Sequence, residues 1–351
     1  MAVDWTRGYS CTWRLLEVDP GTWTDSGRLY GVSSAQVERD GSGDAPELES
    51  ASVEVDAPVA EEFRERYLRL VMIAEQGNST ERVDLCTMLF SSASGKCDMG
   101  VRTHSLSGRS VLFPAATAKT WITYGPYVPK GADGAEEVAA MLSACISAPV
   151  TVDGSFTLED AYVFDRNEAV LVSAWAVLRA GNYGLRVNGR GEVEVGPIRS
   201  VPALVLDSTS ARLLLPGISH EIDMSSVPNR YTAVDGNLVV TVVNDDPTSP
   251  TSTVSRGFAI DVTDENPTRE SGESLDAYAE RRLSEESVIT DSREWTREWW
   301  PDVLPGDIVR AAIPNYGCSG DYRVVQQSIS CGTGATVSEK VEGEVVTWPT
   351  T

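Results

Sequence analysis

One stretch decides the fold expected for the end of the chain: Leu304-Pro305-Gly306-Asp307-Ile308-Val309-Arg310-Ala311-Ala312-Ile313. Pro-Gly favours a tight turn, and the apolar run that follows has a length typical of a β-strand. Two more runs of this kind lie at residues 321–325 and 335–341. The C-terminal part is therefore predicted to be a β domain.

A hairpin and a helix are predicted upstream of that stretch. Residues 231–234 and 238–243 flank Asp235-Gly236-Asn237, and Asp-Gly between two apolar runs is a strong hairpin signal. A polar, turn-rich loop follows at residues 244–253. Helical periodicity predicts a helix over residues 274–287. Its apolar face consists of Leu275, Tyr278, Ala279 and Leu283.

The N-terminal part also reads as β. Short apolar runs, several of them alternating, are separated by Gly, Pro, Asn and Ser, which is typical of a barrel or sandwich. These runs lie at residues 30–32, 48–55, 67–73 and 83–90. Another hairpin is expected within residues 104–113, around Ser107-Gly108.

The middle of the chain changes character and predicts two helices. Asp133 and Glu136 form a capping box, and a helix from there would end before Pro149. Its apolar face consists of Val138, Met141, Leu142 and Cys145. A second helix is expected over residues 167–180, with Gly181 as a left-handed C-cap. Its apolar side carries Leu171, Trp175 and Leu178. Strand-like runs at 151–152, 155–158, 185–187 and 193–195 complete a small α+β module.

These elements place the chain in the α+β class, mostly β, with two barrel-like β domains on either side of the α+β module. The predicted parts are an N-terminal β-barrel-like domain (1–128), the α+β module with two helices (129–200), a β hairpin or connecting domain (201–273), and a helix with a C-terminal β-barrel-like domain (274–351).

Charge and composition exclude several classes of function. The 351 residues carry 52 acidic and 29 basic side chains, a net charge of −23, and binding to nucleic acid needs a basic surface. The start of the chain does not resemble a signal peptide, and no apolar stretch is long enough to span a membrane. The six cysteines form no Cys-x-x-Cys, and only two histidines are present. We expect free thiols, no metal and no cofactor.

Candidate catalytic sites are weak, and the chain is predicted not to be an enzyme. Asp40-x-Ser42-x-Asp44 resembles the start of a calcium loop but lacks the required Gly and Glu later in the loop. His104 and His220 each adjoin a serine, but neighbouring residues on a strand point to opposite faces. Short catalytic motifs such as Gly-x-Ser-x-Gly are absent.

Three tryptophans form the remaining cluster: Trp295, Trp299 and Trp300. Trp295 and Trp299 would share one face if the preceding helix continued through them. Large aromatic side chains contribute strongly to packing and to interfaces, so these residues are candidates for either role. A competing interpretation is that they stack on a sugar.

Two stretches of the second half carry a family resemblance. The first contains Asn229-Arg230-Tyr231 and Asn244, followed by Asp246-Pro247-x-Ser249-Pro250-x-Ser252-x-Val254-x-Arg256-Gly257. The second contains Leu275-x-x-Tyr278-Ala279-x-Arg281-x-Leu283, then Trp300-Pro301-Asp302-Val303-Leu304-Pro305-Gly306-Asp307-Ile308-Val309 and Gly320-Asp321-Tyr322-Arg323-Val324. Together they resemble the central hub proteins of phage and prophage tails, over about residues 200–351. The first 130 residues match that family only in plan.

The resemblance implies a structural protein of a virion tail tip or baseplate, made in the host cytoplasm. It implies a homotrimer whose six barrels surround a channel for DNA, without specific DNA binding, and which joins a sixfold tail tube to a threefold tip. The implied partners are the tail tube, distal tail, tape measure and tip or spike proteins. Competing hypotheses are a receptor- or glycan-binding tail protein, a distal-tail ring protein and a tail-associated cell-wall hydrolase.

Overall fold

The structure is a computed structural model that describes residues 3–5, 8–41, 48–55, 66–98, 101–207, 217–265, 267, 273–301 and 303–346. The chain forms two compact units. The first combines Met1–Gly217 with Trp295–Lys340, and the second combines Ile218–Glu294 with Val341–Thr351. Strands predominate over a smaller number of helices, so the predicted α+β, mostly β class is confirmed.

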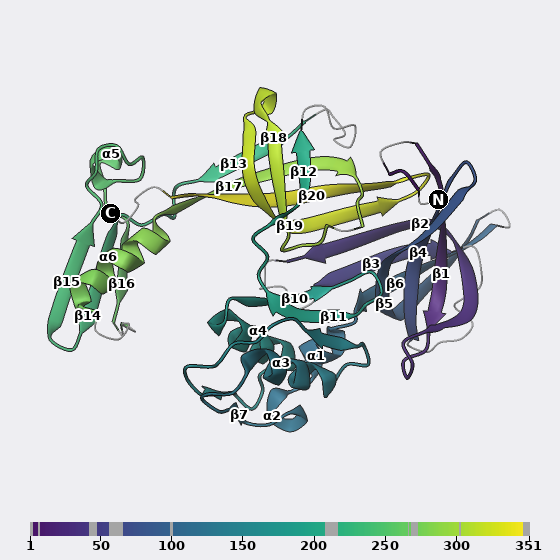
Figure 1. Ribbon diagram of the computed structural model, residues 1–351, viewed down its shortest axis with the longest axis horizontal. Helices are drawn as coiled ribbons and strands as arrows, with labels where there is room; N and C mark the ends of the chain where they lie inside the picture. The colour runs from purple at the N-terminus through teal and green to yellow at the C-terminus, as the bar shows by residue number, and fades with distance from the viewer. Residues whose placement is uncertain are drawn as a thin grey trace. The chain divides into compact units, whose positions relative to one another are not determined.

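Six antiparallel strands of the first unit close into a barrel. They are β1 (Ser10–Val18), β2 (Asp25–Asp40), β3 (Glu49–Val55), β4 (Arg66–Gln76), β5 (Ser79–Asp98) and β6 (Val101–Ser110). Their order is β1-β4-β5-β6-β3-β2, and β1 also pairs with β2, which closes the ring (Figure 1). The runs predicted as strands at 48–55, 67–73 and 83–90 are confirmed.

Alternating burial builds the barrel core. In β3 every second residue is buried, the pattern of a strand with one face toward a core. Leu15, Val37, Val53, Leu70 and Leu85 are fully buried in this core. The barrel has no free edge between its strands, because closure pairs the two outermost strands.

The hairpin expected around Ser107-Gly108 is wrong, because both residues lie inside the continuous strand β6. Gly108 allows the side chain of Phe90 to pack closely against β6. It pairs with Phe90 of β5, and a Cβ at Gly108 would lie 3.0 Å from Cε1 of Phe90. A glycine inside a strand often marks such a close approach and not a turn.

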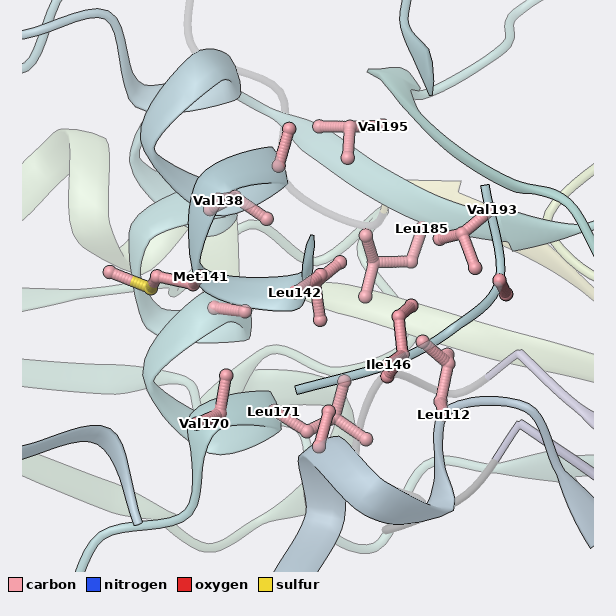
Figure 2. Close-up of a cluster of buried hydrophobic side chains, with 14 of the residues drawn as sticks. Leu112, Val138, Met141, Leu142, Ile146, Val170, Leu171, Leu185, Val193 and Val195 are labelled. Carbon is pink, nitrogen blue, oxygen red and sulfur yellow. The ribbon is translucent and has the colours of Figure 1, made fainter. Parts of the chain in front are cut away.

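An α+β module follows the barrel. It contains α1 (Phe113–Thr117), α2 (Thr120–Thr123), β7 (Tyr127–Val128), α3 (Gly134–Ser143), β8 (Val150–Val152), β9 (Tyr162–Val163), α4 (Val170–Ala180), β10 (Tyr183–Val187) and β11 (Val193–Pro197). One small sheet has the order β10-β11-β8, and α3 and α4 pack against it (Figure 1). Figure 2 shows the core between them, with Leu142 of α3, Leu171 of α4 and Leu185 and Val193 of the sheet.

The first predicted helix of the module is confirmed, but it is shorter than expected. The Asp133 carboxylate accepts hydrogen bonds from the backbone of Ala135 and Glu136, as an N-cap does. The helix ends at Ser143 and not near Pro149. The chain has to turn there, because β8 begins at Val150 and pairs with β11.

The second predicted helix begins later than expected, at Val170 and not at residue 167. Residues 166 and 167 form a turn, and Ala169 is extended and pairs with Lys119. The left-handed cap at Gly181 is also wrong, because Gly181 has φ −101°. Asn182, with φ 55°, takes that conformation instead, and asparagine is one of the few residues that tolerate it. Residues 155–158, expected as a strand, lie outside the strands.

A very close backbone contact joins the module to the barrel. A Cβ at Gly189 would lie 1.8 Å from the carbonyl oxygen of Asp84, so only glycine fits there. The carbonyl of Gly189 accepts a hydrogen bond from Thr87 Oγ1, and that of Arg190 accepts one from Arg69 Nη2. Barrel and module therefore pack as parts of one unit.

The C-terminal strands extend the barrel sheet. They are β12 (Pro202–Asp207), β17 (Val288–Glu298), β18 (Ile308–Ile313), β19 (Cys318–Cys331) and β20 (Ala335–Val346). Two of them, β17 and β20, contain residues of both units. The described pairings give the order β12-β18-β19-β20-β17, and β19 also pairs with β2 of the barrel. The three strands predicted at the end of the chain are confirmed.

The second unit contains a three-stranded sheet covered by one helix. Its elements are β13 (Ser219–Asp223), β14 (Arg230–Asp235), β15 (Leu238–Val243), α5 (Thr253–Arg256), β16 (Asp261–Asp264) and α6 (Leu275–Glu286). The sheet order is β15-β14-β16, and Tyr278 and Leu283 of α6 pack on Tyr231 and Ala233 of β14. The predicted hairpin is confirmed, with Gly236 at φ 60° in its turn. The predicted helix is confirmed, with Ser274 as its N-cap.

Candidate protein-interaction surfaces

The three tryptophans singled out in the sequence do not lie on a helix. Trp295 is in β17, and Trp299 and Trp300 follow the end of that strand. Even spacing still puts Trp295 and Trp299 on one face, because side chains alternate along a strand. Trp295 is 2% and Trp299 3% exposed, while Trp300 is half-buried and makes an edge-to-face contact with Trp5. The buried pair offers no open aromatic face to a sugar in this structure.

A buried polar network surrounds Trp295. The indole Nε1 of Trp295 donates to Oε2 of Glu339 at 2.8 Å, and Nε of Arg297 donates to the same oxygen at 2.7 Å. Gln327 donates to Oε1 of Glu339 at 2.8 Å and to the carbonyl of Val303. A buried charge is tolerated where a partner charge and hydrogen bonds satisfy it. The network therefore connects β17, β19 and β20 through side-chain hydrogen bonds.

Two buried asparagines organise the polar loop that carries the first part of the resemblance. Asn229 Nδ2 donates to the carbonyls of Thr251 and Phe258, and its Oδ1 accepts from the backbone of Ile260. Asn244 Nδ2 donates to Ser249 Oγ at 3.0 Å. Both side chains are fully buried. These two residues of the resembling stretch therefore have a structural role, because they hold the backbone of the loop in place.

The turn before β18 carries the second part of the resemblance. Gly306 has φ 90°, a conformation that side chains rarely permit. The carboxylate of Asp307 is buried, accepts a hydrogen bond from the backbone of Leu304 at 2.9 Å, and forms an ion pair with Arg186 of β10. The Pro-Gly-Asp sequence therefore links this turn to the α+β module, a contact that the sequence alone does not predict.

Several apolar side chains of the α+β module are exposed. Tyr127 and Val163 are cross-strand partners in β7 and β9, and both are exposed. Ile122 of α2 and Val172 of α4 are also exposed, on two helices that contact each other. Single exposed apolar residues are ordinary, but a group of them is a candidate surface for binding another protein.

A second such surface is the edge strand β15 of the second unit. Its outward side chains include Leu238, Val239 and Val243, which are exposed. In the described sheet β15 pairs with β14 alone, so its outer edge is available for hydrogen bonding. Its sequence contains no charge and no proline, the features that normally block an exposed edge. This strand is suited to pairing with a strand of another chain.

The two histidines considered as catalytic candidates belong to different units of the chain. His104 lies in β6 and His220 in β13. Within the described ranges, no three His, Cys, Asp or Glu side chains are placed to hold a metal ion. The calcium-like sequence includes Ser42 and Asp44, which lie outside the described residues. Among the described helices, none has the length and apolar character needed to cross a membrane.

Burial governs the chemistry of the cysteines. It raises the pKa of the Cys145 thiol to about 11 and that of Cys331 to about 12. The pKa of the fully buried Cys86 is raised well above its usual value for the same reason. All three are free thiols. They are kept protonated and weakly nucleophilic at neutral pH.

Two solved structures share the fold of this chain. A tail protein from Neisseria meningitidis MC58 is 15% identical and superposes with a TM-score of 0.65, over 96% of this chain and 97% of that protein. The 43 kDa tail protein of prophage MuSo2 from Shewanella oneidensis is 12% identical with a TM-score of 0.62, over 95% of this chain and 98% of that protein. No protein-family model and no curated protein sequence matches the chain.

The likeness extends over nearly the whole length of this chain and of each of the two tail proteins, so it includes the barrel, the module and the C-terminal strands. The resemblance to phage tail proteins is thereby confirmed for the fold. At identities this low, the structural likeness shows a shared architecture and not shared site residues.

Proposed function

We propose that this chain is the structural hub of a phage-type tail tip or baseplate. It acts as a homotrimer that joins the sixfold tail tube to a threefold tip and borders the channel for DNA. The observation that carries the proposal is the fold shared with two tail proteins over almost the full length of every chain compared. The role is mechanical and not enzymatic.

The proposed partners are the tail tube, distal tail, tape measure and tip or spike proteins, within a virion tail assembled in the host cytoplasm. Such a protein needs several surfaces for other proteins. The exposed apolar residues of the module, including Ile122 and Val163, and the edge strand β15 supply two of them. Neither surface is covered by described residues of the chain, which supports a protein whose exposed apolar surfaces are covered by other tail proteins on assembly.

The acidic excess fits the proposed passage of DNA. With a net charge of −23, a channel lined by carboxylates repels the phosphate backbone within a Debye length of about 8 Å at physiological salt. DNA would then pass without adsorbing. Replacing lumenal acids by lysines, once the channel is mapped, is expected to slow ejection. An unchanged ejection rate would refute this part of the proposal.

Native mass spectrometry of the purified protein tests the oligomer. Three copies per particle support the hub, whereas six copies favour a distal-tail ring protein. A stable monomer at micromolar concentration, with no ring in the presence of the tail-tube partner, counts against both.

A cell-wall hydrolase and a glycan-binding protein each have a direct test. Zymography on peptidoglycan detects a hydrolase, and clearing by the purified chain would contradict a purely mechanical role. A glycan array detects a sugar-binding protein. Binding that is lost in a folded Trp299→Ala variant would favour glycan recognition, although Trp299 is buried.

A further inference from the structure

A pocket of about 260 Å³ lies within the first unit, where the α+β module meets the turn before β18. One wall comes from the end of α4, from β10 and from the residues after β11, and the other from Pro305 and Gly306. Gly41, which follows β2 of the barrel, also lines the pocket, and a Cβ there would lie 2.5 Å from that of Pro305. This volume is slightly below the range of about 300–1,000 Å³ that is typical of sites for small ligands.

The pocket is lined by arginines, in a chain whose charge is strongly negative. They are Arg179, Arg186, Arg199 and Arg323. Arg323 donates through Nη1 to the carbonyls of Gly306 at 2.7 Å and of Arg199 at 3.3 Å. These carbonyls position the guanidinium but carry no full negative charge to balance it.

The carboxylates next to the pocket do not use all of its donors. Asp307 pairs with both terminal nitrogens of Arg186 and lies 3.9 Å from Arg199, which also contacts Glu194 at 3.3 Å. Nε of Arg186 is buried and has no hydrogen-bond acceptor among the described residues. Nε1 of Trp175, another lining residue, is also buried and has no hydrogen-bond acceptor among the described residues.

A buried donor without an acceptor destabilises the folded state, and such atoms are rare in folded proteins. Two of them beside one arginine-lined pocket make the pocket suited to an oxygen acceptor. A carboxylate matches the planar fork of arginine better than a neutral acceptor does. The apolar surfaces of Trp175, Ile198 and Pro197 suit the methylene groups of a glutamate or aspartate side chain.

We propose that this pocket receives an acidic side chain from a neighbouring copy of the same chain. The inference rests on the proposed homotrimer and names one contact within it. Two copies that each carry a net charge of −23 repel each other, so their interface requires places where positive charge meets the acidic surface of the partner. The arginine-lined pocket is such a place.

Sedimentation velocity of matched variants tests the inference. Arg199→Gln and Arg323→Gln each remove one positive charge from the pocket. Arg310→Gln removes the same charge from an exposed ion pair with Asp321 and is the control. Arg199 is 48% exposed, so its replacement leaves the fold intact even if Arg323→Gln unfolds.

The pocket variants are expected to raise the trimer dissociation constant by at least about tenfold and to weaken its salt dependence. The Arg310→Gln control is expected to match the wild type. Folded pocket variants that trimerise as the wild type does would overturn the pocket inference and leave the hub intact. A wild-type protein that sediments as a monomer would overturn the homotrimer, and the pocket contact with it.

Discussion

Arg297 and Glu339 form an ion pair in which neither side chain is exposed to solvent, with 2.7 Å between Nε and Oε2. The two residues lie on β17 and β20 and are 42 positions apart. Removing one member of such a pair leaves a buried charge that nothing balances. Loss of either partner is therefore expected to destabilise the fold, whatever the net contribution of the intact pair.

The first prediction concerns this pair. Glu339→Ala is expected to lower the free energy of unfolding by about 3–5 kcal/mol, because Arg297 would remain buried and unpaired. The matched control is Asp321→Ala, which breaks an exposed pair with Arg310 and should change the free energy of unfolding little. Urea unfolding followed by circular dichroism measures both. Equal losses in the two variants would show that the buried network has no special role.

The second prediction concerns the contact between module and barrel. Gly189→Ala places a Cβ against the carbonyl of Asp84, so the backbone has to shift, at a cost of about 1–3 kcal/mol. Gly184→Ala in the same module is the control, since its Cβ would meet only Ile198 at 3.9 Å. Thermal melting distinguishes them. A Gly189→Ala variant that melts at the wild-type temperature would contradict this close approach of the two backbones.

The third prediction concerns the buried asparagine of the polar loop. Asn229→Ala removes the partners of two carbonyls and one backbone N–H, and each buried group left unsatisfied costs about 1–3 kcal/mol. Asn237→Ala, in the exposed hairpin turn, is expected to change stability little. Hydrogen exchange at the backbone of Ile260 should rise in the first variant alone. Unchanged protection there would mean that the loop does not depend on Asn229.

The fourth prediction concerns pH. Burial raises the pKa of Cys331 to about 12 and that of Cys145 to about 11, whereas an unfolded thiol has a pKa of about 8.5. The folded state keeps protons that the unfolded state releases, so stability falls as pH rises above about 8.5. A thiol reagent at pH 8 should label these two and Cys86 slowly in the native protein and rapidly in denaturant. Fast labelling of Cys86 in the native protein would contradict its burial.

Local signals in the sequence predict local structure well. The Asp235-Gly236 turn, the Asp133 N-cap and the apolar face of Tyr278 and Leu283 each act over a few residues, and each prediction is confirmed. Trp295 is different, since a four-residue spacing fits a helix and a strand equally, and pairing with β20 decides for the strand. Spacing alone does not contain that information.

Long-range contacts set the rest of the fold and the candidate surfaces. Closure of the barrel depends on pairing between β1 and β4, which are separated by two other strands in the sequence. Next to the pocket, Arg186 forms an ion pair with Asp307, which is 121 positions away in the sequence. From the sequence alone Gly108 suggests a turn, but in the structure it lies in a strand and pairs with Phe90. In each case the deciding partner is distant in sequence, so periodicity and turn propensities do not identify it.

Imaging of the assembled tail with this protein labelled tests the central claim most directly. A homotrimeric hub predicts label at the distal end of the tail, in three copies arranged around the tail axis. Label along the tail tube or in the head, or six equivalent copies at the tip, would contradict that role.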